Sequence, residues 1–286
     1  MDTERLKERI RKNWYKFSRN PLSIIGLVTV LGIILIAIFA DFVAPYPKHA
    51  FIFVDFPNAK KSPSYEHLCG TDMSGRDVLS RIFFGFRYSL LMAVSVLSVA
   101  TPPGVLLGLV AGYLRDTWKD TVIMRFADIF LSVPSMVLAL AVCSMLEPTL
   151  YNAMLAITVM WWPWYTRLVY GLASSIRNEY FVQAAEVTGA STFHILFREI
   201  LPNCLSPIFT KMTLDVGWVI LIGSTLSFVG LGAQPPTPDL GTMVSDGSKY
   251  IPGQWWISLF PALFIVLIIL GFNLLGDGVR DMLAGD

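Results

Sequence analysis

The sequence predicts an all-α protein that crosses a membrane several times, and three observations carry this prediction. Of the 286 residues, 54% are hydrophobic and only 15% are charged, whereas soluble domains carry about 25% charged residues. Apolar stretches of about 20 residues, the length that an α-helix needs to cross a bilayer, recur along the chain. Lys and Arg are concentrated in short segments, most densely before the first of these stretches.

The apolar stretches predict six transmembrane helices. Pro102 and Pro103 lie in the second stretch and remove backbone hydrogen bonds, so we expect a break or kink near Thr101. Pro134 interrupts the third stretch, and the fourth contains a cluster of aromatic residues typical of a membrane interface. The six predicted spans are residues 22–43, 89–114, 127–146, 151–170, 206–231 and 255–275.

The sequence argues against a cleaved signal peptide and against a structure held together by its cysteines. The first apolar run is too long for the hydrophobic region of a signal peptide, so we interpret it as a retained span. The three cysteines, Cys69, Cys143 and Cys204, are odd in number and have no CxxC spacing. They support neither a disulfide framework nor a zinc site, and we expect them to be packing residues.

The distribution of basic residues predicts the orientation. Seven Lys and Arg residues precede the first span within residues 1–20, which places the N-terminus in the cytoplasm by the positive-inside rule. Six spans then return the C-terminus to the same side. The predicted divisions are a basic segment 1–20, a first span 21–44, an extracytoplasmic loop 45–88 and a five-helix core 89–286 with a cytoplasmic segment 171–203. The loop 45–88 is also basic, but long loops follow the charge rule poorly.

The segment 171–203 is the most informative part of the chain. Apolar residues with helical spacing, from Tyr180 to Val187, are interrupted by Gly189 and resume from Phe193 to Ile200, and we expect Pro202 to end the second helix. Gly189 permits a sharp turn. Such a short surface helix can dock into a groove of a partner, or it can rest on lipid headgroups. The pattern alone leaves both possibilities open.

The residues Gln183-Ala184-Ala185-Glu186-Val187-Thr188-Gly189, followed by Ile200-Leu201-Pro202, resemble the EAA loop of ABC importer permeases. That pattern reads Glu-Ala-Ala, three residues, Gly, and then Ile-x-Leu-Pro after a fixed gap. Two positions depart from it: Gln183 replaces the leading Glu, and Glu199 stands where the later Ile is usual.

Four further motifs extend the resemblance over nearly the whole chain, to the C-type permease of dipeptide, oligopeptide and nickel importers. One motif precedes the first span, one precedes the second, one surrounds the third, and one lies at the end of the fifth. They are Arg19-Asn20-Pro21-Leu22, the segment 70–81, Met124-Arg125 with Asp128-Ile129-Phe130 and Pro134, and the segment 226–232.

The resemblance implies a type I ABC importer permease in the plasma (inner) membrane, which is a transport subunit and not an enzyme. Its implied partners are a second homologous permease, two cytoplasmic ABC ATPases, an extracytoplasmic substrate-binding protein and membrane lipid, with no nucleic acid. ATP and Mg are expected on the ATPases, because this sequence has no Gly-x-x-x-x-Gly-Lys-Ser/Thr loop. The implied ATPase-coupling residues are Gln183, Ala184, Ala185, Glu186, Gly189, Ala190, Ser191 and Pro202.

The cargo implied by the resemblance is a di- or oligopeptide, with nickel or another small solute, such as a sugar, as alternatives. A secondary transporter driven by an ion gradient is a different class, and it predicts inverted repeats and charged pairs at mid-membrane. An intramembrane enzyme needs a nucleophile with its base, or metal ligands such as a HExxH helix, and we find neither pattern in the sequence.

Ionisable and polar residues within spans are costly and usually face a cavity or a partner. Asp215 is therefore a candidate contact for a substrate amino group, although it is also placed to pair with Lys211 one turn earlier. Asn273 is the other candidate: it either lines the path of the substrate through the membrane or bridges two helices.

The predicted outer loop contains His67, Asp72, Arg76 and Asp77 close together in sequence. A single histidine without repeated ligand spacing argues against a metal site, and the Gly-containing segments between these residues read as turns. We therefore predict no metal here, and the resemblance favours a structural or receptor-facing role.

Overall fold

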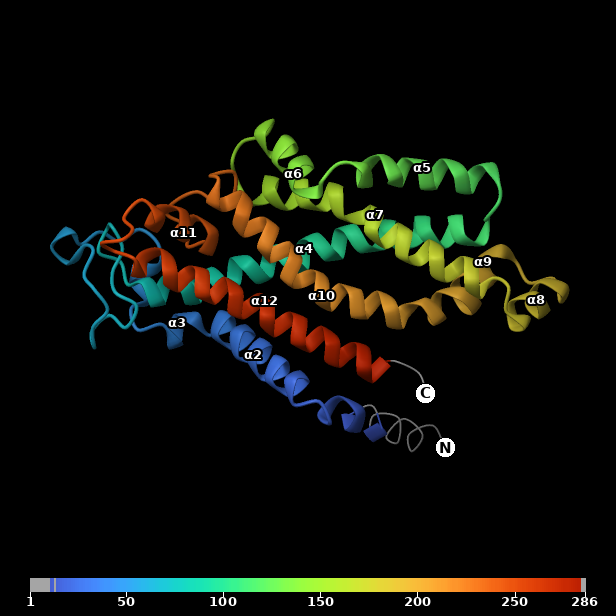
Figure 1. Ribbon diagram of the computed structural model, residues 1–286, viewed down its shortest axis with the longest axis horizontal. Coiled ribbons are helices and arrows are strands. Elements are labelled where there is room, and N and C mark those ends of the chain that lie inside the picture. Colours follow the sequence, from blue (N-terminus) through green and yellow to red (C-terminus); the bar gives the residue numbers. More distant parts are fainter. Residues whose placement is uncertain (1–10, 13, 284–286) are drawn as a thin grey trace.

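The computed structural model describes residues 11–12 and 14–283, and it is helical almost throughout this range. Long helices run side by side along the long axis of the molecule (Figure 1). Extended backbone pairs in the described part of the chain only at an isolated bridge between Thr71 and Asp77. The all-α prediction is therefore confirmed.

The helices are α2 (Pro21–Ile38), α3 (Ala40–Val43), α4 (Val78–Tyr113), α5 (Trp118–Ser132), α6 (Ser135–Ser144), α7 (Leu150–Ile176), α8 (Tyr180–Val187), α9 (Thr192–His194), α10 (Leu201–Phe228), α11 (Leu240–Ser248) and α12 (Trp256–Leu283). Two 3₁₀ turns, η1 (Pro47–Ala50) and η2 (Phe56–Asn58), lie in the loop before α4, and a π-helical segment, η3 (Ile195–Ile200), joins α9 to α10. Helices α8 and α11 lie at opposite ends of the molecule (Figure 1). We call these the α8 end and the α11 end.

Four helical runs are long and apolar enough to cross a membrane: α2, α4, the run Thr192–Phe228 and α12. Helices α5 and α6 form a fifth candidate span if they are taken together, although they meet at an angle of 82°. This break confirms the predicted interruption at Pro134. The proline directly precedes α6, and the backbone of the residue before it, Val133, is extended, as is usual before a proline. Helix α7 has 27 residues, about 40 Å at 1.5 Å per residue, but it is not among the apolar runs. A total of six spans stays a prediction.

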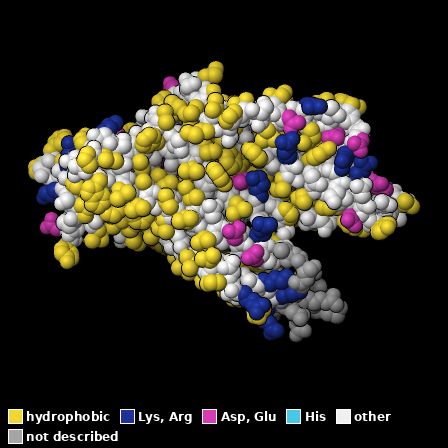
Figure 2. Space-filling model, viewed as in Figure 1, with side chains coloured by type: hydrophobic (Ala, Val, Ile, Leu, Met, Phe, Trp, Pro, Cys, Tyr) yellow, Lys and Arg dark blue, Asp and Glu magenta, His cyan; other side chains and the backbone are white. Residues whose placement is uncertain are grey.

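Hydrophobic side chains cover much of the face shown in Figure 2, whereas Lys, Arg, Asp and Glu gather mainly over the half nearer the α8 end, with a few at the opposite tip. Most of the side chains buried inside the bundle are also apolar. The three cysteines are free and buried, as expected of packing residues. A helix bundle that is apolar both inside and outside suits a bilayer, because lipid tails do not penalise exposed apolar side chains.

Helix α4 packs closely along α7 through glycines spaced one turn apart. A Cβ atom on Gly104 would collide with the backbone oxygen of Trp162, and one on Gly108 with that of Thr166. A Cβ atom on Gly112 would collide with the Cβ of Ala173 and the backbone oxygen of Tyr170. Small residues at this spacing let helix backbones approach each other, which is how helices gain packing energy within lipid.

Helix α4 differs from the predictions at its start and at its two prolines, where no break occurs. The helix begins at Val78 rather than near residue 89, because Asp77 caps it by accepting a hydrogen bond from the Ser80 amide. It also continues unbroken through Pro102 and Pro103. Proline has a φ compatible with a helix and costs mainly hydrogen bonds, so the packing against α7 can keep the helix continuous.

The expectation that Pro202 ends a helix is also wrong. The chain is helical from Thr192 to Phe228, passing through η3 directly into α10. Pro202 occupies the first turn of α10, where a missing N–H costs little. The π-type pairing of η3 adjusts the helix at this junction. The helical run that contains the predicted fifth span therefore begins well before residue 206.

Candidate functional site

Helix α8 projects from one end of the bundle (Figure 1), and several of its apolar side chains are exposed. Tyr180 and Val187 are 87% and 89% exposed, and Phe193, just after the helix, is 70% exposed. Val182 is the buried residue of α8. Tyr180, Ala184 and Val187 of the predicted apolar set thus face away from the chain's own core and are available to another surface, whereas Ala185 packs partly against the core.

One side-chain contact joins α8 to the C-terminal end of α4. The hydroxyl of Tyr113 donates a hydrogen bond to Oε1 of Glu186 at 3.0 Å. The guanidinium of Arg177 lies over the Tyr113 ring, 5.7 Å from its centroid. Gln183 donates from Nε2 to the carbonyl of Asn178 at 3.0 Å, within the turn that leads into α8. Glu186 and Gln183 therefore fix the helix, while Ala184 is left exposed and Ala185 half-buried.

The turn after α8 is built around Gly189. Its φ is +82° and a Cβ atom there would meet nothing within 4 Å, so glycine is needed for the backbone conformation and not for space. The amide of Ala190 donates to the carbonyl of Ala185 at 3.0 Å. The hydroxyl of Ser191 accepts a hydrogen bond from the His194 amide at 3.3 Å and caps α9.

Seven of the eight predicted coupling residues, from Gln183 to Ser191, thus lie in α8 and the turn that follows it. Pro202 lies apart from them, beyond α9 and η3 and inside α10. The sequence did not reveal Tyr113 as a partner of this segment, because 73 positions separate it from Glu186.

Asp215 is buried in the middle of α10, with 4% of its surface exposed. Lys211 Nζ lies 3.0 Å from one carboxylate oxygen, as the spacing of the two residues predicted. The indole N–H of Trp161, from α7, donates to the other oxygen at 3.0 Å. The carboxylate is therefore paired and hydrogen-bonded, which is the condition for keeping a charge away from water.

This ion pair lines two cavities. The first, of about 320 Å³, lies between α6, α7 and α10 and is walled by Trp161, Trp164 and Trp218. The second, of about 530 Å³, lies along α10 and includes Arg280 of α12. Lys211, Asp215 and Trp218 line both cavities. Asn273, the other candidate for the path, is half-buried on α12 and is not among the residues that line these two cavities.

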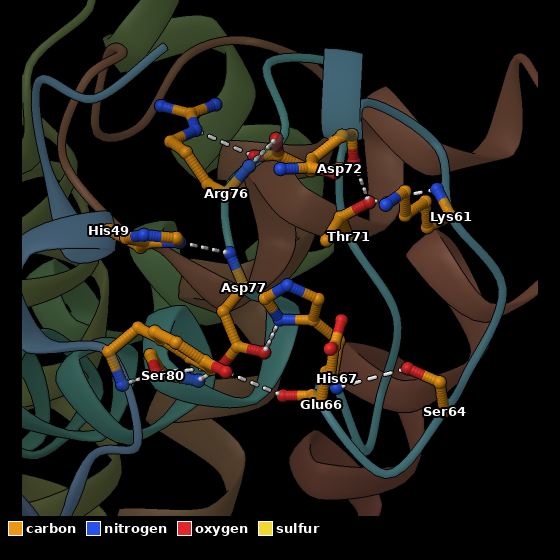
Figure 3. Close-up of polar contacts among 12 residues, drawn as sticks. His49, Lys61, Ser64, Glu66, His67, Thr71, Asp72, Arg76, Asp77 and Ser80 are labelled. Carbon is orange, nitrogen blue, oxygen red and sulfur yellow. Dashed lines mark hydrogen bonds and ion pairs between the residues drawn. The ribbon is translucent and has the colours of Figure 1, made fainter. Parts of the chain in front are cut away.

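The predicted loop cluster forms a polar network at the α11 end (Figure 3). Nδ1 of His67 lies 2.8 Å from Oδ1 of Asp77, whose Oδ2 accepts hydrogen bonds from the amide and hydroxyl of Ser80. Asp72 pairs with Nε of Arg76 at 2.6 Å and with that of Arg81 at 3.7 Å. No group of three or more potential metal ligands occurs within the described residues. These contacts fasten the loop to the start of α4.

His49 completes the attachment of the loop. Its Nδ1 accepts a hydrogen bond from the Asp77 amide at 3.2 Å (Figure 3), and its ring stacks on that of Phe53 at 3.8 Å. Burial lowers the pKa of His49 below its ordinary value, although Asp77 opposes this shift. On the other side of the loop, the indole of Trp256 donates to the carbonyl of Thr71 at 3.3 Å.

The fold is that of a membrane protein with several spans, and comparison with known proteins shows its family. Residues 104–285 match the binding-protein-dependent transport system inner membrane component family, and residues 9–63 match the N-terminal transmembrane domain of oligopeptide transport permease C. The chain belongs to the binding-protein-dependent transport system inner membrane component family.

Curated relatives align over nearly the full chain. The dipeptide transport system permease protein DppC of Escherichia coli K12 is 42% identical over 277 residues, which are 96% of this chain and 92% of that protein. The probable D,D-dipeptide transport system permease protein DdpC of the same strain is 41% identical, covering 92% of this chain and 87% of its own. The glutathione transport system permease protein GsiD of Pectobacterium atrosepticum is 36% identical over 96% of this chain and 90% of its own.

A solved structure supports the same fold. A chain of the MetNI methionine ABC transporter, in an inward-facing conformation, superposes with a TM-score of 0.59 over 70% of this chain and 95% of that chain, at 17% identity. At this identity the likeness concerns the fold alone.

Proposed function

We propose that this chain is one of two permease subunits of an ABC importer for dipeptides, and that α8 is its coupling helix. The observation that supports this most directly is the outward-facing apolar surface of α8, formed by Tyr180 and Val187 within the EAA-like segment. An exposed apolar patch at the tip of a membrane protein is typical of a protein-protein contact. A groove on a cytoplasmic ATPase is the partner that the family relationship suggests.

The proposed orientation places the α8 end in the cytoplasm, together with the start of α2 and the end of α12. The basic residues that precede α2, among them Arg11, Lys16 and Arg19, support this through the positive-inside rule. The loop network around Asp77 then faces the extracytoplasmic side, where a substrate-binding protein would deliver cargo. A second permease is expected to complete the path.

The proposed mechanism passes through two connections of α8 to the bundle. Closure of the ATPase pair on ATP moves α8, and the Glu186–Tyr113 hydrogen bond carries this displacement to α4. The continuous helix through η3 carries it to α10. A rocking of the spans between two arrangements gives alternating access. The partner chains bind and hydrolyse the ATP.

Dipeptides are the proposed cargo because two of the relatives reported above are named for dipeptide transport. Nickel or another small solute, such as a sugar, is the alternative for the same architecture. Uptake competition in reconstituted vesicles distinguishes them, since unlabelled dipeptide should compete with labelled dipeptide and nickel should not.

The test of coupling compares two glycines with matched geometry. Gly189 and Gly230 have φ values of +82° and +91°, and a Cβ atom on either would meet nothing within 4 Å. They lie at opposite ends of the molecule, so Gly189→Arg and Gly230→Arg impose similar backbone strain in different places. The chain is co-expressed and purified with its partners, and ATPase association and ATP-driven dipeptide uptake are measured.

We expect Gly189→Arg to remove the ATPase or to abolish uptake, while Gly230→Arg retains both. Equal effects of the two variants would show that strain alone is responsible. If the wild-type chain recruits no ATPase, the proposed function is wrong, and a transporter driven by an ion gradient becomes the leading account.

A further inference from the structure

We infer that Lys211 contacts the carboxylate of the transported peptide, and that Asp215 and Trp161 hold the lysine side chain in position. This inference rests on the proposed function and assigns a role to the two cavities around α10. The elements that form the site are distant in sequence, and they meet around one ammonium group.

Lys211 is the accessible member of its ion pair. Its side chain is 27% exposed, whereas that of Asp215 is 5% exposed. Asp215 is held from two sides, by Lys211 and by the Trp161 indole, each at 3.0 Å. An ammonium group has three donors, and one of them points at Asp215. The remaining donors are therefore free to meet an acceptor in the cavities that Lys211 lines.

Aromatic rings hold the lysine in place without using its donors. The Nζ atom lies 5.9 Å from the centroid of the Trp164 ring and 5.5 Å from that of Tyr165. Cation–π attraction at such distances restricts the side chain. Lys211 is thus a fixed positive charge at the boundary of two cavities.

The charge of the second cavity favours an anion. Its lining contains two cations, Lys211 and Arg280, and a single carboxylate, that of the buried Asp215. Arg280 is exposed, and no side chain among the residues that the structure describes pairs with it. A ligand with one carboxylate would balance this excess charge, and a peptide carries such a group at its C-terminus.

The size and walls of the cavities suit a small peptide. Their volumes, about 320 and 530 Å³, fall within the range of small-molecule sites. Trp164 and Trp218 are 45% and 57% exposed and offer apolar surface for side chains of varied shape. One charged contact beside apolar walls suits a small peptide, because the terminal carboxylate is common to all peptides while their side chains vary.

The test uses the complete transporter, reconstituted with its partner chains in vesicles. ATP-driven uptake of a dipeptide is measured for the wild type, Lys211→Gln, Lys211→Arg and the double variant Lys211→Gln/Asp215→Asn. Loss of one charge-assisted hydrogen bond lowers the rate of Lys211→Gln about tenfold. Lys211→Arg retains most of the uptake, and the double variant stays as slow as Lys211→Gln.

The double variant separates this inference from a purely structural ion pair. If the pair is only structural, removing both charges leaves no unpaired carboxylate and uptake recovers, which would overturn the inference. A rate for Lys211→Gln equal to that of the wild type would overturn it as well. A wild-type complex that imports no dipeptide contradicts the proposed function instead, so the two failures are distinguishable.

A second measurement reads the charge of the site directly. A cysteine is introduced by Trp218→Cys at the cavities, or by Phe228→Cys at the far end of α10, and its reaction with carboxylate-bearing and ammonium-bearing thiol reagents of similar size is timed. We expect the cavity cysteine to prefer the carboxylate reagent, and Lys211→Gln to reduce that preference severalfold, with no change at the control position. An unchanged preference would contradict the inference.

Discussion

The hydroxyl of Tyr113, at the last residue of α4, donates a hydrogen bond to Oε1 of Glu186 on α8 at 3.0 Å. Most of α8 is exposed and Val182 is its buried anchor, so this bond is a main polar connection between the helix and the bundle. It ties the segment that we propose to meet the ATPase to a helix that crosses the membrane.

Removing this bond should uncouple ATP hydrolysis from transport. Tyr113→Phe keeps the ring beneath Arg177 and deletes only the donor. Because the bond is solvent-exposed, its loss should cost little stability, about 1 kcal/mol or less. We expect dipeptide uptake to fall severalfold while the ATPase rate of the complex persists. Tyr151→Phe, an exposed tyrosine in α7, is the control, and equal uptake by both variants would contradict the role of Tyr113.

The α4–α7 contact predicts a contrast between two Gly→Ala substitutions. At Gly108 a Cβ atom would collide with the Thr166 backbone oxygen, whereas at Gly171 it would meet nothing within 4 Å. Gly108→Ala must push the helices apart and should destabilise the protein by about 1–3 kcal/mol. Gly171→Ala should be neutral or stabilising by up to about 1 kcal/mol, because alanine favours helix. Thermal unfolding in lipid nanodiscs measures both, and a similar melting temperature for the two variants would refute the close-packing argument.

Sequence reasoning succeeded where the signal is local. Apolar runs located the helices, Pro134 located the break between α5 and α6, and the i,i+4 spacing paired Lys211 with Asp215. Each of these depends on neighbours within one or two turns. Periodicity and composition report such relationships directly.

The sequence was less informative where distant segments decide the structure. The start of α4 was missed because Arg81 looks like a loop residue, whereas it is buried beside Asp72. Trp161 lies 54 positions from Asp215, and no pattern in the sequence links the two. Pro202 misled the interpretation because the same residue that stops a helix interior is tolerated in a first turn.

Asp77 should be the residue on which attachment of the loop to α4 depends most. Its side chain is 1% exposed, caps α4 at the Ser80 amide and meets His67 at 2.8 Å. Asp77→Ala leaves these groups unpaired and should cost about 2–3 kcal/mol. Asp77→Asn retains an acceptor for the cap and should cost less. Limited proteolysis within residues 51–66, together with thermal unfolding, ranks the stabilities of the two variants. If Asp77→Asn and Asp77→Ala lose the same stability, the charge of Asp77 matters and its hydrogen bond to the Ser80 amide does not.

His49 should make the stability of the loop depend on pH. Burial lowers its pKa below the ordinary value of 6.5, and its Nδ1 must be unprotonated to accept the hydrogen bond from the Asp77 amide at 3.2 Å. The unfolded chain therefore binds a proton more readily than the folded one. The contribution of neutral His49 is complete above about pH 6.5 and is lost as the pH falls below that value, by at most about 1.4 kcal/mol per pH unit.

The matched variant is His49→Phe, which keeps a ring to stack on Phe53 but has no titrating group. Thermal unfolding of both proteins is measured at pH 7.5 and pH 5.0. The variant should be less stable than the wild type at pH 7.5, because the Asp77 amide loses its acceptor. Its melting temperature should fall less between the two pH values, because the remaining titrations are common to both proteins. If the two proteins lose the same stability on acidification, His49 does not titrate with unfolding, and the pH dependence originates in other groups.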